Sequence, residues 1–260
     1  MLRPRLIPCL LVHNQGLVKT VRFGDPKYVG DPINAVRIYN EKMVDELMVL
    51  DIDATVEGRP PNYDLIAKLS RECRMPMSYG GGITRIEEIE RIIGLGVEKV
   101  AVSAAAVTNP ELINAAAERV GSQSVVVVVD LKKAGLMRRY EVVTHNASHR
   151  TGRAPEAFIR EAQARGAGEV VINFVDRDGT MAGYDLPMIE KLRAETSLPM
   201  TALGGAGSPA DIVELWRAQG LIGAGVGSLF VFKGKYRAVL INYPNAQEKA
   251  ALLQQAGLRT

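Results

Sequence analysis

The sequence predicts an α/β fold: a (β/α)8 TIM barrel built from two repeated half-barrels. Eight short apolar runs alternate with amphipathic helical patterns, which is the order that a parallel sheet with crossover helices requires. The length of 260 residues suits one such domain. Similar marks also recur at one fixed spacing, which indicates that a half-unit is written twice.

The internal repeat rests on residues at the ends of predicted strands. Three pairs lie 124 or 125 residues apart: Gly80 and Gly204, Asp51 and Asp176, and Ser103 and Ser228. A fixed offset at independent positions is typical of duplication. We therefore predict a single domain over 1–260, with half-barrels at about 1–122 and 123–245 and a C-terminal tail at 246–260.

In the first half, the predicted strands are short apolar runs: Leu6–Val12, Glu46–Asp51, Met77–Tyr79 and Lys99–Val102. The segments that follow them carry apolar residues at helical spacing: Pro32–Lys42, Tyr63–Arg74, Ile86–Leu95 and Pro110–Val120. The long segment His13 to Gly30, with three glycines, follows the first strand without a helical pattern. We predict that it is a loop that acts as a lid over the barrel.

The second half repeats this order. Its predicted strands are Val125–Asp130, Glu169–Phe174, Met200–Leu203 and Gly223–Gly227, and its helices are Ala154–Arg165, Pro187–Thr196 and Ser208–Gln219. The unbroken apolar run of the first of these strands fits a strand buried on both faces. A doubly wound open sheet is the alternative, but the repeat and the count of eight favour closure. The tail from Tyr243 predicts a short terminal helix after a Pro-Asn turn.

Composition excludes several classes of function. The net charge is +3, and the aromatic residues, 5% of the chain, are not interleaved with basic ones, so we predict no nucleic-acid surface. No run is long enough to span a membrane. Cys9 and Cys73 lie in apolar surroundings, which favours a reduced, cytoplasmic protein. The basic and then apolar start resembles an export signal, but it reaches His13 without a cleavage site, and a first core strand explains it better.

The carboxyl ends of barrel strands form the active face of such folds. Glycine turns there let backbone N–H groups approach an anion. Gly205, Gly227 and Ser228 suit one phosphate, and Gly82 and Ser103 suit a second. Ordinary barrel turns are the alternative for each turn alone, but two turns at symmetric positions favour a substrate with two phosphates.

Carboxylates also follow predicted strands at this face. Asp130 ends an apolar strand, where burial could raise the pKa of a proton-transferring carboxylate, and an ion pair with Lys132 or Lys133 is the alternative. Asp51, Asn173 and Asp176 could orient substrate, and the two aspartates could instead cap the following turns. Lys19 in the long loop could reach a phosphate or remain solvated.

The three histidines, His13, His145 and His149, show no metal-ligand spacing, so we predict no metal and no cofactor. Asp130 and His145 could belong to a nucleophilic relay. No serine or cysteine nucleophile motif accompanies them.

Four charged residues lie near the starts of predicted strands, at the opposite face: Arg5, Glu46, Lys99 and Glu169. Two cations and two anions there could form a closed ring over the lower end of the barrel. Ordinary surface ion pairs, which contribute little to stability, are the alternative.

Together, these residues resemble the cyclase subunit of imidazole glycerol phosphate synthase over roughly residues 2 to 245. The matching stretches are Ile7-Pro8-Cys9-Leu10, Gly30-Asp31-Pro32, Asp45-Glu46-Leu47, Leu50-Asp51-Ile52, Gly80-Gly81-Gly82-Ile83, Gly121 to Val127, Asp176 to Thr180 and Gly204-Gly205-Ala206-Gly207. The resemblance implies a half-barrel duplication that binds a substrate with two phosphates. It also implies a glutaminase partner at the barrel bottom, whose ammonia passes through the barrel for imidazole ring formation.

Roles follow from the resemblance residue by residue. Asp130 matches one of two catalytic aspartates, and Lys19 matches the loop lysine, so the resemblance implies a catalytic role for both residues. Phosphate-binding positions of the family match Gly82, Asp178, Gly179, Gly205 and Ser228. The charged gate through which ammonia enters matches Arg5, Glu46, Lys99 and Glu169.

The sequence departs from the family pattern at the active face. Leu11 stands where the family has its other catalytic aspartate, and leucine cannot transfer a proton. Ser103-Ala104, Asn173 and Leu203 also replace the family's Asn-Thr, threonine and serine. This pattern resembles paralogues found beside sugar-amidating enzymes of surface-polysaccharide (lipopolysaccharide O-antigen) pathways.

Three hypotheses remain open from the sequence. The chain could form imidazole glycerol phosphate, with Asp130 alone or with a replacement for the missing acid. It could instead be a conduit that activates a glutaminase and relays ammonia to a sugar amidotransferase. An isomerase of the related aminoimidazole ribotide type would share the phosphate turns but would not need the charged ring.

Overall fold

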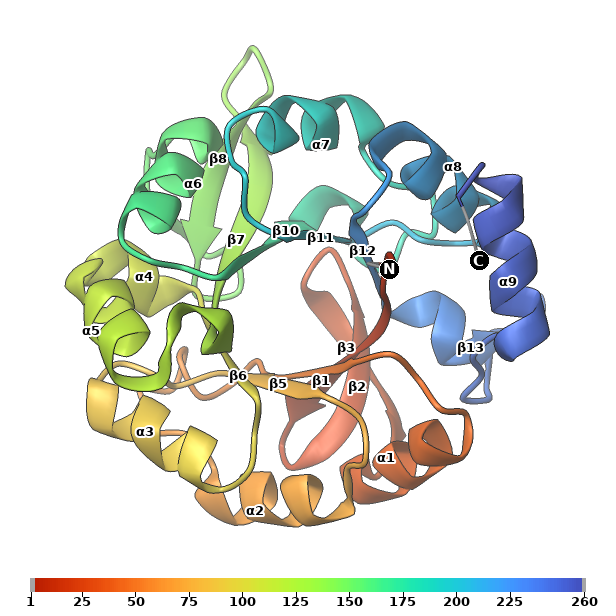
Figure 1. The fold of residues 1–260 in the computed structure, drawn as a ribbon, viewed down its shortest axis with the longest axis horizontal. Coiled ribbons are helices and arrows are strands. Elements are labelled where there is room, and N and C mark those ends of the chain that lie inside the picture. Colours follow the sequence, from red (N-terminus) through yellow and green to blue (C-terminus); the bar gives the residue numbers. More distant parts are fainter. Residues whose placement is uncertain (1–2, 259–260) are drawn as a thin grey trace.

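Eight parallel strands close into a barrel in the computed structural model, which describes residues 3–258 (Figure 1). The strands are β1 (Leu6–His13), β4 (Leu47–Asp51), β5 (Met77–Gly80), β6 (Lys99–Val102), β7 (Val125–Ala134), β10 (Glu169–Phe174), β11 (Met200–Leu203) and β12 (Gly223–Val226). Each pairs in parallel with the next, and the ring closes where β12 pairs with β1. The predicted TIM barrel is confirmed.

Helices surround the barrel, as Figure 1 shows. They are α1 (Pro32–Glu41), α2 (Tyr63–Glu72), α3 (Ile86–Gly94), α4 (Ala104–Thr108), α5 (Glu111–Val120), α6 (Pro155–Ala164), α7 (Leu186–Arg193), α8 (Pro209–Gln219) and α9 (Ala246–Gln255). Several begin where the sequence supplies a side-chain cap. Asp31 accepts a hydrogen bond from the Asn34 N–H at the start of α1, and Ser208 does the same for Asp211 in α8. The predicted terminal helix is α9.

Short antiparallel strands follow the first strand of each half. β2 (Gly16–Val21) and β3 (Gly24–Gly30) come after β1, whereas β8 (Arg139–Thr144) and β9 (His149–Arg150) come after β7. A further hairpin, β13 (Phe232–Lys233) with β14 (Ala238–Val239), follows β12 and the short 3-10 turn Ser228–Phe230. The same order of elements in both halves agrees with duplication. The predicted bounds 1–260 include residues 1–2 and 259–260, which lie outside the described residues.

The segment 13–30 is a paired hairpin, not the loop that we predicted. β1 continues past the barrel and turns back at Asn14 and Gln15, so that β2 pairs with β1 and β3 pairs with β2. In Figure 1 this hairpin crosses the barrel opening. Its three glycines and its polar turn residues interrupt the apolar alternation that would have indicated strands. The pairing itself depends on how far β1 continues beyond the barrel, which the sequence pattern does not indicate.

The core has two layers. An outer layer lies between the strands and the helices, and an inner layer fills the lumen with side chains from most strands: Ile7, Cys9, Met48, Ala101, Val126, Val128, Val171 and Leu203. Alternate residues of β7 face the two layers. This explains the unbroken apolar run of that strand, since both of its faces are buried.

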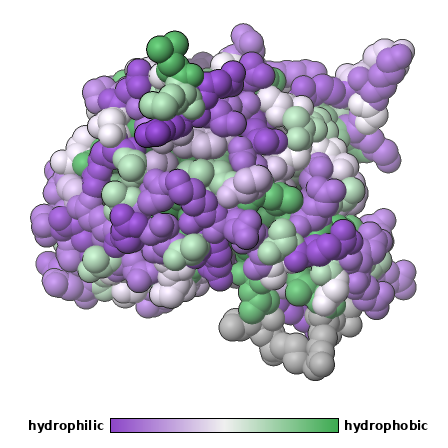
Figure 2. Space-filling view, turned by 90° about the horizontal axis from the view of Figure 1, so that it is seen from above, coloured by the Kyte–Doolittle hydropathy of each residue, from purple (hydrophilic) through white to green (hydrophobic). Residues whose placement is uncertain are grey.

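The outer surface is mainly polar on the side that Figure 2 shows, with a small apolar knob projecting from its upper edge. The most exposed apolar side chain within residues 3–258 is Leu136, in the turn between β7 and β8. Single exposed apolar residues are normal on a soluble fold and need no binding role.

Candidate active site

Two adjoining pockets lie at the carboxyl ends of the barrel strands. The first is formed by the ends of β4 to β7 and includes Gly82, Ser103 and Asp130. The second is formed by the ends of β10 to β12. It includes the other predicted phosphate-binding residues: Asp178, Gly179, Gly205, Gly227 and Ser228. The structure thus places the two predicted sets of phosphate-binding residues in two neighbouring pockets.

Three side chains line both pockets and lie between them. Leu11 comes from β1, Asn173 from β10, and Phe23 from the turn of the β2–β3 hairpin. A ligand with two anionic ends could place one end in each pocket. Its middle would then lie against Leu11, an aliphatic side chain that cannot exchange a proton.

Close backbone packing explains the glycines at these positions. A Cβ added at Gly82 would come within 2.5 Å of the Arg59 carbonyl oxygen, and one at Gly205 within 2.1 Å of the Gly183 oxygen. Both residues also have positive φ, at 72° and 113°. The fold therefore requires glycine there with or without a phosphate, and the Gly82 N–H already donates to Thr55 Oγ1 at 3.2 Å.

Lys19 is buried in the second pocket with an exposed fraction of 4%. Its ammonium donates to the Cys9 carbonyl oxygen, and no carboxylate of the described residues lies within salt-bridge distance of it. Removal of water by burial lowers the pKa of Lys19, against weaker effects of Cys9 and Asp178. A buried cation with one neutral partner is a favourable site for an anion.

Asp178 holds the β2–β3 hairpin over this pocket. Its carboxylate accepts a hydrogen bond from the Thr20 hydroxyl at 2.6 Å and one from the Phe23 N–H at 3.3 Å. Burial raises the pKa of Asp178, and the hydrogen bonds from Thr20 and Phe23 oppose that rise. The residue predicted to bind phosphate thus anchors the hairpin that carries Lys19.

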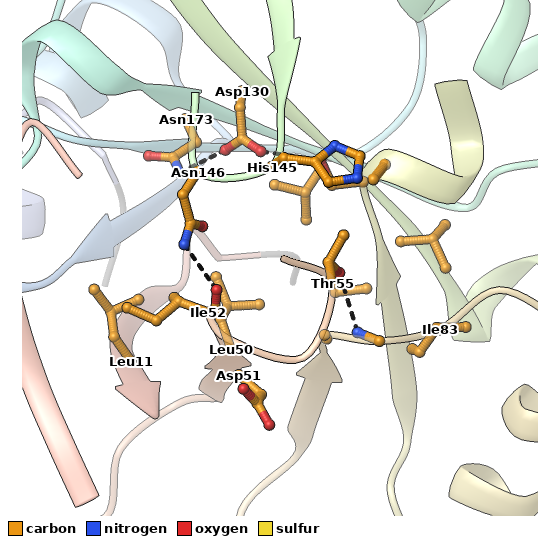
Figure 3. A pocket seen from close by; sticks show the side chains of 18 of the residues that line it. Leu11, Leu50, Asp51, Ile52, Thr55, Ile83, Asp130, His145, Asn146 and Asn173 are labelled. Atoms are coloured by element: carbon orange, nitrogen blue, oxygen red, sulfur yellow. Dashed lines mark hydrogen bonds between the residues drawn. The ribbon is translucent and has the colours of Figure 1, made fainter. Parts of the chain in front are cut away.

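Asp130 lies at the base of the first pocket (Figure 3). Its two carboxylate oxygens accept hydrogen bonds from the Ser103 hydroxyl at 2.9 Å and from the Asn173 amide at 2.8 Å. Burial raises its pKa to about 6, and the two hydrogen bonds moderate the rise. The ion pair considered for Asp130 is not formed within residues 3–258, where Lys133 contacts Asp185 and no salt bridge joins Lys132 to Asp130.

Replacing Asp130 with asparagine should stabilise the fold above pH 6. The folded-state pKa is raised, so the unfolded chain loses its proton first, and the contribution of Asp130 to stability falls as pH rises from about 4 to 6. We expect D130N to exceed the wild type by about 1 to 2 kcal/mol at pH 8, because the side chain is only partly buried. Urea unfolding from pH 4 to 8 measures this difference, and a difference that does not change with pH would contradict it.

Asp51 and Asp176 serve mainly as backbone acceptors. Asp51 Oδ1 accepts hydrogen bonds from the N–H groups of Asp53 and Ala54, both at 3.0 Å, and Asp176 Oδ2 accepts one from Lys133 N–H at 2.8 Å. Asp51 lines the first pocket, whereas Asp176 lines neither. The capping alternative therefore accounts for the hydrogen bonds of Asp51, whereas Asp176 binds the backbone of β7 and does not cap the turn that follows it.

The four charges at the other end of the barrel form a closed ring. Arg5 contacts both oxygens of Glu169, at 2.6 and 3.1 Å, and also contacts Glu46. Lys99 Nζ lies 2.9 Å from an oxygen of Glu46 and 2.9 Å from one of Glu169. Each cation therefore bridges the same two carboxylates. Of the two alternatives for these residues, the geometry is that of a ring and not of separate surface pairs.

The ring lies directly below the inner core layer. The Glu46 and Glu169 side chains are 4% and 6% exposed, whereas those of Arg5 and Lys99 are 28% and 18% exposed. Burial alone would raise the pKa of Glu169, but hydrogen bonds and charge from Arg5 and Lys99 hold it below its usual range. Arg5 and Lys99 thus hold the Glu169 carboxylate in its charged form.

Residues 3–258 contain neither a metal-binding cluster nor a membrane-spanning helix. No three His, Cys, Asp or Glu side chains there converge as a metal site. In the same part of the chain, no helix has the length and apolar character to cross a membrane.

Comparison with known proteins identifies the family to which this chain belongs. A family model described as histidine biosynthesis protein matches residues 5–237. The chain belongs to that family. A protein of Leptospira interrogans, named provisionally as imidazole glycerol phosphate synthase subunit HisF, is 54% identical over 97% of this chain and 99% of its own. A protein of Vibrio vulnificus strain YJ016, named provisionally as subunit hisF3, is 51% identical over 98% of each chain.

A relative named without that qualification is more distant. The imidazole glycerol phosphate synthase subunit HisF of Hyphomonas neptunium is 38% identical over 89% of this chain and 91% of its own. This member of the histidine biosynthesis family is thus a homologue of the HisF-type cyclase subunits. The family resemblance inferred from the motifs is confirmed.

Sequence reasoning missed several residues of the first pocket. Phe23, Thr55 and Asn146 line it, and so does His145, which we considered only for a nucleophilic relay. No described hydrogen bond joins His145 to Asp130, so that relay is not formed. The turn carrying His145 has three successive non-glycine residues with positive φ, a conformation that residue type does not signal.

Proposed function

We propose that this chain is the ammonia-using, cyclase-type subunit of a glutamine amidotransferase of the imidazole glycerol phosphate synthase family. The observation that carries this proposal is the closed ring of Arg5, Glu46, Lys99 and Glu169 in line with the lumen and with Asp130. A TIM-barrel enzyme that bound only a substrate from solution would not need a charged ring below its core. A barrel that receives a small molecule from a partner protein would need such a ring as a gate.

The proposed path runs from this ring to the two pockets. Ammonia from a glutaminase partner at the lower face would pass between the ring charges into the lumen. The inner layer there is formed mainly by apolar side chains, with the buried hydroxyls of Ser78 and Thr201 beside them, and such a lining favours neutral ammonia over ammonium. At the upper end, Asp130 with its raised pKa is the acceptor for the proton that ammonia loses on bond formation.

The substrate in this proposal has a phosphate at each end. One phosphate would pair with Lys19 in the second pocket, and the other would lie in the first pocket near Gly82 and Ser103. The missing carboxylate partner of Lys19 supports the first assignment. A phosphate there gives the ammonium a charge-assisted hydrogen bond in place of solvent.

Lys19→Ala should weaken phosphate binding. A hydrogen bond to a charged group contributes about 1.5 to 3 kcal/mol, so we expect affinity to fall about 10- to 100-fold. Calorimetric titration with the two-phosphate ribonucleotide of the family measures this change. Lys27→Ala is the matched control, because Lys27 pairs with Lys19 on the same hairpin but is exposed. Equal effects of the two variants would contradict the assignment.

Leu11 favours a second candidate function, in which the chain relays ammonia to a sugar amidotransferase of lipopolysaccharide O-antigen synthesis. Leu11 and Leu203 place aliphatic side chains at the upper end of the lumen, at positions where the resemblance to the family's cyclases implies an aspartate and a serine. Four relatives with provisional names are 47 to 54% identical, whereas four named without that qualification are 38 to 40% identical. The chain thus groups with the provisionally named relatives.

An assay with ammonium chloride and the two-phosphate ribonucleotide separates these functions without a glutaminase. Turnover within about tenfold of an authentic cyclase would exclude the relay as the main function. No turnover by the wild type, with turnover restored by Leu11→Asp, would exclude ring formation and support a cyclase-impaired relay. Stimulation of a glutaminase by the purified chain would tell against the isomerase hypothesis.

A further inference from the structure

We propose that His145 is the second proton-transferring residue of the first pocket and acts with Asp130 in the absence of an acid at position 11. This inference rests on the proposed ring formation at the upper face. It assigns a catalytic role to a side chain outside the barrel strands, in the turn between β8 and β9.

The first pocket contains few groups that can exchange a proton. Its titratable side chains are Asp51, Asp130 and His145. The Oδ1 atom of Asp51 accepts hydrogen bonds from backbone N–H groups of its own loop, and its Oδ2 atom lies 3.7 Å from Nη1 of Arg59. In Figure 3 its carboxylate points away from Asp130. Only Asp130 and His145 remain free to act on a substrate in this pocket.

The pairing of β7 with β8 brings the turn that carries His145 to the pocket that holds Asp130. Asp130 lies opposite Val143, near the end of β8 at Thr144. The left-handed turn that follows places His145 at this pocket, and both side chains line it. Figure 3 shows His145 and Asp130 on one side of the pocket and Leu11 on the other.

The imidazole is oriented by its neighbours. Nδ1 lies 3.0 Å from the hydroxyl of Thr144, which is 2% exposed. No partner of Nε2 is found within residues 3–258, which leaves that nitrogen for a ligand. The other titratable ring beside it is His149, at 6.0 Å between ring centroids, and it does not line the pocket.

The turn itself is held over the pocket in a costly conformation. His145, Asn146 and Ala147 have φ values of 53°, 53° and 62°. Left-handed non-glycine residues cost about 1 kcal/mol or more each and persist where the surroundings enforce them. The Asn146 side chain supplies such a constraint, because it donates a hydrogen bond at 2.8 Å to the Ile52 carbonyl oxygen across the pocket. Figure 3 shows this bridge.

The chemistry needs one base and one acid. Asp130, ionised, takes a proton from the nitrogen of ammonia as the new N–C bond forms. His145, protonated, donates a proton through Nε2 to the leaving amine nitrogen as the old C–N bond breaks. One proton is taken up and one is given, and exchange with water restores both side chains. Imidazole is the side chain best suited to this donation near neutral pH.

His145→Gln should lower ammonia-dependent turnover of the two-phosphate ribonucleotide about 10²-fold. It should also abolish the fall in rate at high pH that loss of the imidazolium proton causes, which a merely structural role would not do. His149→Gln is the matched control and should keep both rate and pH profile. Asn146→Ala, which only loosens the turn, should raise KM and keep the high-pH limb.

Two further results decide the proposal. Leu11→Asp should restore turnover to His145→Gln, since the new carboxylic acid replaces the lost donor. In spectra of protein labelled at histidine Cε1, the His145 signal, one of three, should shift when the ribonucleotide binds. An unshifted signal, or a His145→Gln variant with the wild-type pH profile, would overturn the proposal. If glutaminase coupling persisted in that case, the proposed ammonia function would still stand.

Discussion

Asp130→Asn is expected to lower ammonia-dependent turnover about 10²- to 10⁴-fold, which is the usual effect of removing a general base. Asparagine keeps the shape of the side chain and can still accept the Asn173 hydrogen bond at Oδ1. It cannot take a proton. Initial rates with saturating ammonium chloride and ribonucleotide measure the loss, and substrate affinity should change far less than kcat.

The pH profile of the wild type provides an independent check. Asp130 must be ionised to act as a base, so the rising, low-pH limb of the rate should be centred near pH 6. Asp64→Asn, on the exposed start of α2, is the control and should retain the profile. A profile centred near pH 4 would show that the carboxylate is not desolvated during the reaction.

The barrel was predictable because its signals are local. Each strand run and each helix pattern lies within a few turns of chain, and the fixed offset between Asp51 and Asp176 gives the topology. Hairpins were the exception. β2, β3, β8 and β9 are held by pairing with the extended ends of β1 and β7, and that pairing depends on how far the strands run beyond the barrel.

The site was predictable where the position of a residue along its strand determines which residues it meets. Strand-end position brought Asp130, Ser103 and Asn173 into contact, and opposite charges at strand starts brought the ring together. The positions of Phe23 and His145 were not predictable, because each depends on a turn with left-handed residues. The Gly82 and Gly205 turns show the limit of such signals, since backbone packing alone requires glycine at both.

Lys99→Ala is expected to uncouple glutamine hydrolysis from amination in a complex with the glutaminase. Lys99 bridges Glu46 and Glu169, so its removal opens one side of the ring and leaves two carboxylates nine-tenths buried with Arg5 alone. Ammonia would then escape to solvent. Because one side of the ring is then open to solvent, we expect the ratio of nitrogen incorporated to glutamine hydrolysed to fall severalfold.

The readout is this ratio and not either rate alone. Product and glutamate are measured together, with glutamine and separately with ammonium chloride as the nitrogen source. A defect confined to glutamine points to the ring, whereas an equal loss with ammonium chloride would mean that Lys99→Ala damages the upper pockets. Lys68→Ala, on the exposed surface of α2, is the matched control. If Lys99→Ala kept the wild-type ratio, the ring would stabilise the lower end of the barrel, as buried ion pairs can, without controlling ammonia.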